Sequence, residues 1–312
     1  MVKGLLFLPF LFLTSISYGA SVYDIGNAIS NARAACGGIN LYLSEMKKMA
    51  GINTAVTGVG TVVGIGATAT GIAKSAKDKE HDEIIAELEK MGVKKIETEE
   101  ELISLLATLL EESDDQDDVS LAKELYRKKN SLEEKSKKLG NWRTGLLAVN
   151  TATNVAGTVI ANKNRVDSNL YEKIDACRES IKELSAVRMQ IRVSGESDET
   201  QDAVAKKIID ACGDWELVDL SSVDNRARGA TISSGVGVGT GLAGTIVSAI
   251  ANSKNVRDSD NGKKEKNLNA AANVLAGGAT VVSGVATVFN ATQINAIKKA
   301  VETADKCEEA LQ

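Results

Sequence analysis

The sequence predicts an all-α protein built from two long antiparallel helical hairpins, packed through Gly/Ala-rich seams and related by an internal duplication. Three observations lead to this fold class. The only proline, Pro9, lies in the N-terminal leader, so nothing in the rest of the chain forbids long helices. Four uncharged stretches alternate with charged sequence that is rich in strong helix formers. The first and third of these stretches are similar to each other, which indicates a repeat.

The N-terminal residues are typical of a cleavable export signal. Lys3 supplies a basic start, and residues 4–13 form an apolar core that is short for a membrane span. Small residues precede a cleavage position after Gly19 or Ala20. We therefore expect a signal peptide over residues 1–20 and an exported protein in the periplasm, the envelope or the medium. The alternative interpretation is an uncleaved N-terminal anchor.

The remaining composition limits the classes of function. The 37 Lys and Arg residues less Lys3 leave 36 basic against 42 acidic residues, a formal net charge of −6. This acidity argues against binding to nucleic acid. His81 is the only histidine, and no motif places a nucleophile, a paired carboxylate or a zinc ligand set. We expect no enzyme, and no catalytic, cofactor-binding or metal residue.

The repeat divides the chain into two units and an insert. The uncharged stretches cover 52–73, 144–162, 229–253 and 267–297. Gly60 and Gly64 recur 177 residues later as Gly237 and Gly241, and Thr151 recurs 129 residues later as Thr280. We expect a first hairpin unit at 21–77 and 140–193, a charged helical insert at 78–139, and a second hairpin unit at 199–312.

Four cysteines in an exported chain predict two disulfides. If each unit folds back on itself, arms of about 55–60 Å bring each cysteine pair to the base of its hairpin. This register predicts the pairs Cys36–Cys177 and Cys212–Cys307. The alternative pairing, Cys177–Cys212 with Cys36–Cys307, stays open because the two inner cysteines flank the break at 194–197 almost symmetrically.

The stretch GVGTVVGIGATATG at 58–71 contains a glycine pattern found in phosphate-binding loops. It lacks a preceding strand and the Gly-Lys-Ser/Thr ending of a P-loop, so we do not expect nucleotide binding. Its small residues instead recur at helical spacing, which predicts a helix seam where two backbones approach closely. The expected seam residues are Gly60, Gly64, Ala67 and Gly71, then Gly237, Gly241, Gly244 and Ser248, and finally Gly277 and Gly284.

These seams resemble those of glycine-zipper proteins of bacterial envelopes and, more distantly, of helical toxins that hide an apolar hairpin. The resemblance implies helix association near or in membranes and implies no catalysis. The chain as a whole looks like an exported helical protein of a Gram-negative bacterium.

Two functions follow as hypotheses. The stretches of 19 to 31 uncharged residues are long enough to cross a bilayer, but they contain Asn53, Asn150 and Asn154 and few large apolar side chains. We therefore favour an exported, disulfide-bonded helical bundle with a structural or protein-interaction role, through a protein partner or self-association. The alternative is a membrane-active protein whose hairpins insert into a bilayer as a pore-former or an anchor.

Overall fold

The computed structural model describes residues 22–90, 104, 116–195, 198–253, 256 and 262–312. Across these residues every regular element is helical, which confirms the all-α class. The chain divides into two compact units. Unit 1 comprises Met1–Ser44, Asp167–Asp219 and Lys298–Gln312, and unit 2 comprises Glu45–Val166 and Leu220–Ile297. The expected signal peptide and the middle of the expected insert lie outside the described residues.

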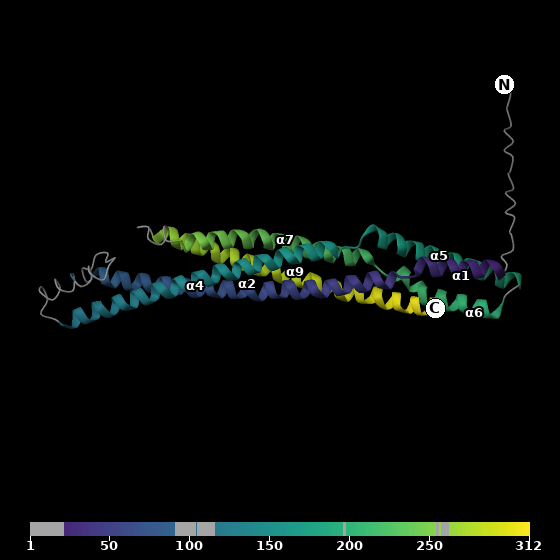
Figure 1. Cartoon of the computed structure of the whole chain (residues 1–312), viewed down its shortest axis with the longest axis horizontal. Coiled ribbons are helices and arrows are strands. Elements are labelled where there is room, and N and C mark those ends of the chain that lie inside the picture. The colour runs from purple at the N-terminus through teal and green to yellow at the C-terminus, as the bar shows by residue number, and fades with distance from the viewer. Residues whose placement is uncertain (1–21, 91–103, 105–115, 196–197, 254–255, 257–261) are drawn as a thin grey trace, which may run out of the picture. The chain divides into compact units, whose positions relative to one another are not determined.

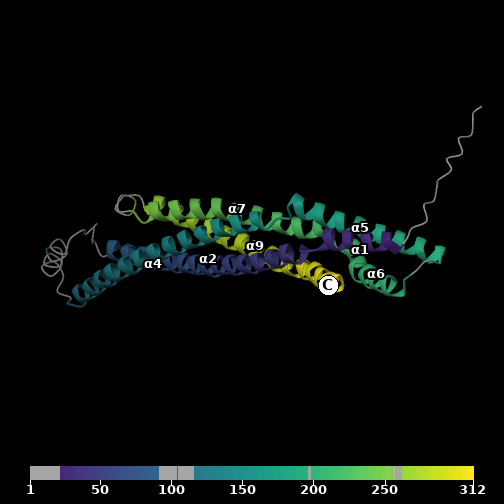
Figure 2. The same cartoon turned by 45° about the vertical axis from the view of Figure 1, so that its right-hand side comes forward.

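Unit 2 is built from four long helices that run alongside one another (Figures 1 and 2). These helices are α2 (Ile39–Lys90), α4 (Gln116–Lys163), α7 (Leu220–Ala251) and α9 (Gly262–Leu311). Gly60 on α2 lies against Thr153 on α4, and Gly241 on α7 lies against Thr151 on α4. Helix α2 also contacts α9, because Gly64 lies against Thr280. Helix α4 therefore packs against both α2 and α7.

The charged insert does not begin with separate helices at the expected boundaries. Helix α2 continues without interruption to Lys90, and α4 already begins at Gln116. The physical reason is local: neither 74–90 nor 116–139 contains a Gly or Pro that would end a helix. The described parts of the insert are thus extensions of the two arms of the first hairpin.

Unit 1 has the organisation of an ordinary water-soluble bundle. It contains α1 (Val22–Cys36), α5 (Ser168–Ser194), α6 (Glu199–Cys212), the short 3-10 helix η1 (Gly213–Leu217) and the adjoining ends of α2 and α9. Large apolar side chains fill its core, and these include Ile25, Ile174, Leu184, Ile208 and Trp215. Its Lys, Arg, Asp and Glu side chains are exposed or half-buried.

Capping residues mark where the helices of unit 1 begin and end. The side chain of Asp167 accepts a hydrogen bond from the Leu170 backbone at the start of α5, and Gly195 ends this helix with a φ of 76°. Gly38, also with a φ of 76°, separates α1 from α2. The compact units cut across the expected hairpin units, because each takes segments from both hairpins.

Candidate functional site

The surface of unit 2 is apolar over most of its length. Its large exposed side chains are Val, Ile and Leu, and Val62 and Val281 are 69 % and 66 % exposed. We call this surface the apolar belt. Its members are Ile52, Val59, Val62, Ile65, Ile72, Val149, Val155, Val159, Ile232, Val236, Leu242, Ile246, Ile250, Val274, Val281, Val285 and Val288. Contiguous exposed apolar surface of this extent is unusual in soluble proteins and marks an interaction site.

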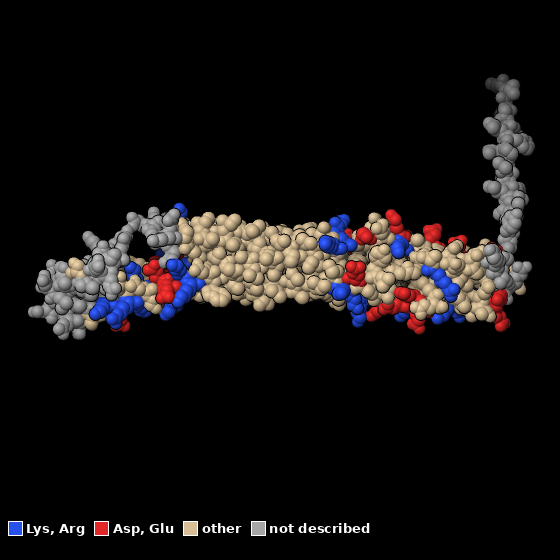
Figure 3. Space-filling model, viewed as in Figure 1, with Lys and Arg blue, Asp and Glu red and all other residues tan. Residues whose placement is uncertain are grey.

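Charged residues bound the apolar belt at both ends. Figure 3 shows one face, where a wide zone without Lys, Arg, Asp or Glu separates two groups of charged side chains. The uncharged segments of the four helices are 49–73, 144–162, 229–251 and 267–297. At 1.5 Å per residue the shortest is about 28 Å long and the longest about 46 Å.

Three helical segments of the described chain are long and apolar enough to cross a membrane. They are Asp24–Lys90, Leu220–Ala251 and Lys264–Leu311, which contain α2, α7 and α9. Only 28–33 % of their most apolar windows is buried inside the protein. The apolar side chains in these windows therefore face outward more than inward.

The interior of unit 2 contains layers of polar side chains between small apolar residues. In its central layer, the Asn154 side-chain amide of α4 donates to Ser283 Oγ of α9 and to Asn150 Oδ1, each at 3.0 Å. The Ser283 hydroxyl lies 3.1 Å from Asn150 Oδ1. All three side chains are buried. Hydrogen bonds of this kind join helices where no water reaches them.

Two further polar layers lie toward the end of unit 2 where α4 stops. Asn53 of α2 donates to Asn290 Oδ1 of α9 at 2.9 Å. One turn further along α9, Gln293 donates to the backbone carbonyl of Asn164 at 3.2 Å. Each layer connects α9 to another helix through a buried amide.

A charged cluster closes the other end of the interior. Lys74 is buried, and its Nζ lies 2.7 Å from Asp78 and 3.0 Å from Glu265. Ser136 of α4 donates to the Asp78 carboxylate. Arg143 is fully buried and belongs to the same cluster.

The guanidinium of Arg143 joins three helices. Its Nε donates to Ser248 of α7 at 2.9 Å, and its Nη1 and Nη2 donate to Asn273 and Asn269 of α9 at 3.0 and 2.7 Å. With Lys74, Asp78 and Glu265 the cluster holds two cations and two anions. The cluster has no net charge, and its hydrogen bonds connect neighbouring helices.

The structure places most of the expected seam glycines at close helix contacts. A Cβ atom built on Gly60, Gly64 or Gly241 would lie 2.5 Å from a threonine Oγ1 of a neighbouring helix. At Gly237 it would lie 2.8 Å from Asn154, and at Gly244 it would lie 3.2 Å from Leu275. Gly71 faces Asn273, and Ala67 and Ser248 are buried.

Gly277 and Gly284 lie elsewhere. A Cβ atom on Gly277 would meet nothing within 4 Å, and one on Gly284 only Thr61 at 3.9 Å. The buried positions of α9 come one residue earlier, at Ala276 and Ser283. Thr280 and Thr287, at the spacing of Gly277 and Gly284, lie against α2, so this face of α9 is occupied by its threonines and not by its glycines.

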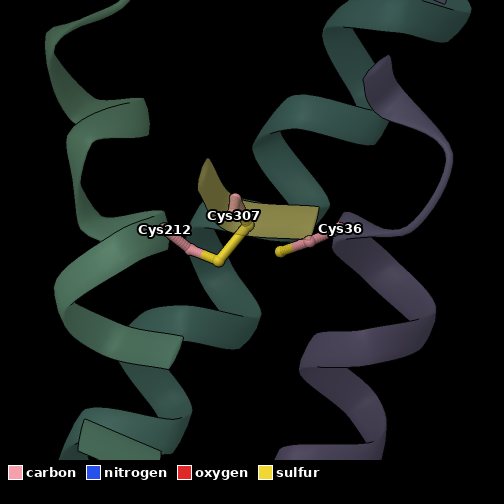
Figure 4. A group of neighbouring side chains, drawn as sticks. All are labelled: Cys36, Cys212 and Cys307. Carbon is pink, nitrogen blue, oxygen red and sulfur yellow. A yellow bond between two sulfur atoms is a disulfide. The ribbon is translucent and has the colours of Figure 1, made fainter. Parts of the chain in front are cut away.

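The four cysteines lie in the core of unit 1. The sulfur atoms of Cys36 and Cys177 are 1.98 Å apart and those of Cys212 and Cys307 are 2.01 Å apart, both disulfide distances. This is the first of the two pairings that the sequence left open. The sulfur atoms of Cys36, Cys212 and Cys307 all lie within 4.8 Å of one another (Figure 4), so the two disulfides are neighbours.

Titratable groups with shifted pKa values lie outside the apolar belt. Burial lowers the pKa of His81 and Lys129 lowers it further, while the carboxylates of Glu133, Asp82 and Asp78 oppose this shift. A hydrogen bond from Arg188 lowers the pKa of Asp202 in unit 1. Asp202 pairs with Arg188, and neither His81 nor this pair converges with a nucleophile in the described part of the chain.

The comparisons with known proteins provide no relative. No family model, no curated protein and no solved structure matches the chain. Its function therefore has to be argued from the distribution of polar and apolar side chains over the two units.

Proposed function

We propose that the protein is an exported membrane protein without enzymatic activity, whose unit 2 crosses a bilayer as a four-helix bundle and anchors unit 1 and the charged insert. One observation carries this proposal: unit 2 exposes its large apolar side chains over the belt and buries Asn, Ser and Gln side chains beside small residues, whereas unit 1 buries its large apolar side chains and exposes its charged ones. The two solvents that these patterns suit are lipid for unit 2 and water for unit 1.

The energetics of the apolar belt favour lipid. In water, its exposed Val and Ile side chains gain nothing from burial, while transfer of such a side chain to an apolar surrounding is worth about 1.5–3 kcal/mol. The polar interior fits the same solvent, because buried Asn and Ser side chains hydrogen-bond between membrane helices. Asn150 and Asn154 do not oppose insertion, since they face Ser283 and not the exterior.

The dimensions of the belt match a bilayer. The hydrocarbon core of a bilayer is about 30 Å thick, and the shortest uncharged segment, 144–162, is about 28 Å long. The segment of α7 at 229–251, about 34 Å long, spans the same thickness with a modest tilt, and the longer segment of α9 extends beyond it. Trp142, 68 % exposed, stands at one end of the belt, where tryptophan is enriched in membrane proteins.

The seams and the duplication belong to the same proposal. Gly64 lies against Thr280, and Gly241 lies against Thr151. These two contacts correspond in the expected repeat, because Gly241 lies 177 residues after Gly64 and Thr280 lies 129 residues after Thr151. A second pair of contacts corresponds by the same offsets: Gly71 lies against Asn273, and Ser248 hydrogen-bonds to Thr144. These equivalent contacts support two parallel repeats related by an axis along the bundle, as in membrane proteins that arose by duplication.

The export route gives the two ends of unit 2 different surroundings. The expected signal peptide would carry the start of the mature chain across the membrane. The four cysteines of unit 1 are all paired, which suits an oxidising compartment. We therefore infer that unit 1 lies on the exported side and that the insert lies on the opposite side.

Flotation with vesicles tests the proposal. The mature, oxidised protein is reconstituted into phosphatidylcholine vesicles and washed with alkaline carbonate, which removes peripheral proteins. We expect it to float with the vesicles, to need detergent for extraction, and to stay inserted after reduction. A protein that remains in the aqueous phase without detergent, as a monomer or as an oligomer joined through the belt, would contradict the membrane assignment.

A further inference from the structure

Basic side chains stand on each helix of unit 2 just beyond one end of the apolar belt. We call the six that belong to unit 2 the basic ring: Lys47 and Lys48 on α2, Lys163 at the end of α4 and Arg165 just after it, and Arg226 and Arg228 on α7. Helix α9 continues past its uncharged segment with Lys298 and Lys299. The Arg165–Asp224 ion pair and the layer of Asn164 and Gln293 show that α4, α7 and α9 meet at this level.

The basic ring has more positive charge than the protein neutralises. Asp224 pairs with Arg165 at 3.2 Å and with Arg228 at 3.0 Å. Glu45 is the other acidic residue of unit 2 near this end. Across the part of the chain that the structure describes, the remaining four ring cations form no ion pair: Lys47, Lys48, Lys163 and Arg226.

The opposite end of the belt is built differently. There Lys74, Lys77 and Lys266 have carboxylate partners within the protein. The buried Arg143 donates to neutral side chains instead. Lys74 pairs with Asp78 and Glu265, and Lys266 pairs with Asp82 at 2.6 Å. These pairs contrast with the four ring cations that form no ion pair among the described residues.

We propose that the basic ring binds the phosphate groups of anionic phospholipids. This inference rests on the proposed membrane insertion, which places the ring at the level of the lipid headgroups. Lysine and arginine there can extend to the interface while their methylene groups lie along the acyl chains. Each basic residue near an anionic surface strengthens binding by about fivefold. Four unpaired cations at one level thus select phosphatidylglycerol-like headgroups over neutral ones.

The test compares two quadruple variants of the full mature chain in dodecyl maltoside. The ring variant carries Lys47→Gln, Lys48→Gln, Lys163→Gln and Arg226→Gln. The control variant removes the same charge from exposed residues at least about 12 Å beyond the other end of the belt: Lys90→Gln, Lys123→Gln, Arg127→Gln and Lys135→Gln. Thermal unfolding is followed with added phosphatidylglycerol, phosphatidylcholine, glycerophosphoglycerol or inorganic phosphate, at low and high salt.

We expect phosphatidylglycerol to raise the Tm of the wild type and of the control by several degrees, and the ring variant to lose most of this shift. Phosphatidylcholine and the two soluble phosphates should leave the Tm unchanged, and high salt should reduce the lipid effect. An equal shift in the ring variant would overturn the inference. An equal shift with inorganic phosphate would assign the ring to a free anion and overturn the lipid assignment.

The two proposals fail in different ways. If all three proteins insert into phosphatidylcholine vesicles and phosphatidylglycerol has no ring-dependent effect, only the lipid inference fails. If the wild type inserts into neither neutral nor anionic vesicles, the membrane assignment itself fails, whatever the Tm values show.

Discussion

An arginine in the middle of the apolar belt distinguishes lipid from water on the outer face of unit 2. Val62 is 69 % exposed and lies about 21 Å from Lys48 and about 18 Å from Lys74 along α2, close to the middle of the uncharged segment. In water, a change from Val to Arg at such a position alters the free energy of unfolding by about 0.5 kcal/mol or less.

In a bilayer the same change makes insertion of the helix less favourable. Arginine at the centre of a membrane helix costs about 2.5–3.5 kcal/mol, or roughly a 70- to 400-fold change in an insertion equilibrium. We expect Val62→Arg to lower the equilibrium constant for insertion into vesicles by this factor. Val281→Arg on α9, where the side chain is 66 % exposed, should act alike and nearly additively.

The matched control is Val193→Arg in unit 1, where the side chain is 85 % exposed. It should leave insertion and unfolding unchanged, because unit 1 faces water in our proposal. If Val62→Arg and Val193→Arg both behave as neutral surface substitutions, with the protein stable in buffer alone, the belt does not face lipid and the reasoning is refuted.

Three further predictions address the interior of unit 2 and the insert. Gly64→Ala should destabilise the bundle by about 1–3 kcal/mol because the new Cβ atom would lie 2.5 Å from Thr280 Oγ1. Gly58→Ala, which has open space around it, should stabilise α2 by up to about 1 kcal/mol. Chemical unfolding in detergent measures both variants, and equal effects would contradict the close contact at Gly64. Arg143→Met should cost about 3–5 kcal/mol in the same assay, since it leaves the buried Ser248 and Asn269 without their donor and removes one of the two cations of the cluster. A neutral result would show that the cluster is hydrated. Burial lowers the pKa of His81 in the folded state, so the folded state binds fewer protons than the unfolded state. The free energy of unfolding should therefore fall as the pH decreases through about 6.5. His81→Gln should flatten this slope between pH 7.5 and 5.5, and an unchanged slope would assign the pH dependence to other groups.

The fold class and the cysteine pairs follow from regularities that a sequence displays directly. A helix advances by a constant rise, so the distances of Cys36 and Cys177 from the turn of their hairpin can be compared by counting residues. The same counting predicted the repeat, because an offset between two segments can be read from their residue types. Gly64 and Gly241 were identifiable for this reason, and both lie against a threonine.

The polarity of the outer surface could not be read in the same way. Hydropathy averaged along a helix gives inward and outward faces equal weight, so Asn150 and Asn154 counted against a membrane although both face the interior. Which face is inward depends on the neighbouring helices, and Gly, Ala and Thr occur on all faces of α9. Lys74 and Arg143 were visible only as ends of uncharged stretches, since nothing local indicates that both are buried in one cluster.

The two disulfides also turn each helical hairpin into a closed covalent loop. One loop contains α2, the insert and α4 between Cys36 and Cys177, and the other contains α7 and the larger part of α9 between Cys212 and Cys307. A single cut by a protease anywhere inside a loop leaves the fragments joined. The oxidised protein can therefore tolerate cleavage within the insert and remain one molecule, and the cut would become visible as separate pieces only after reduction.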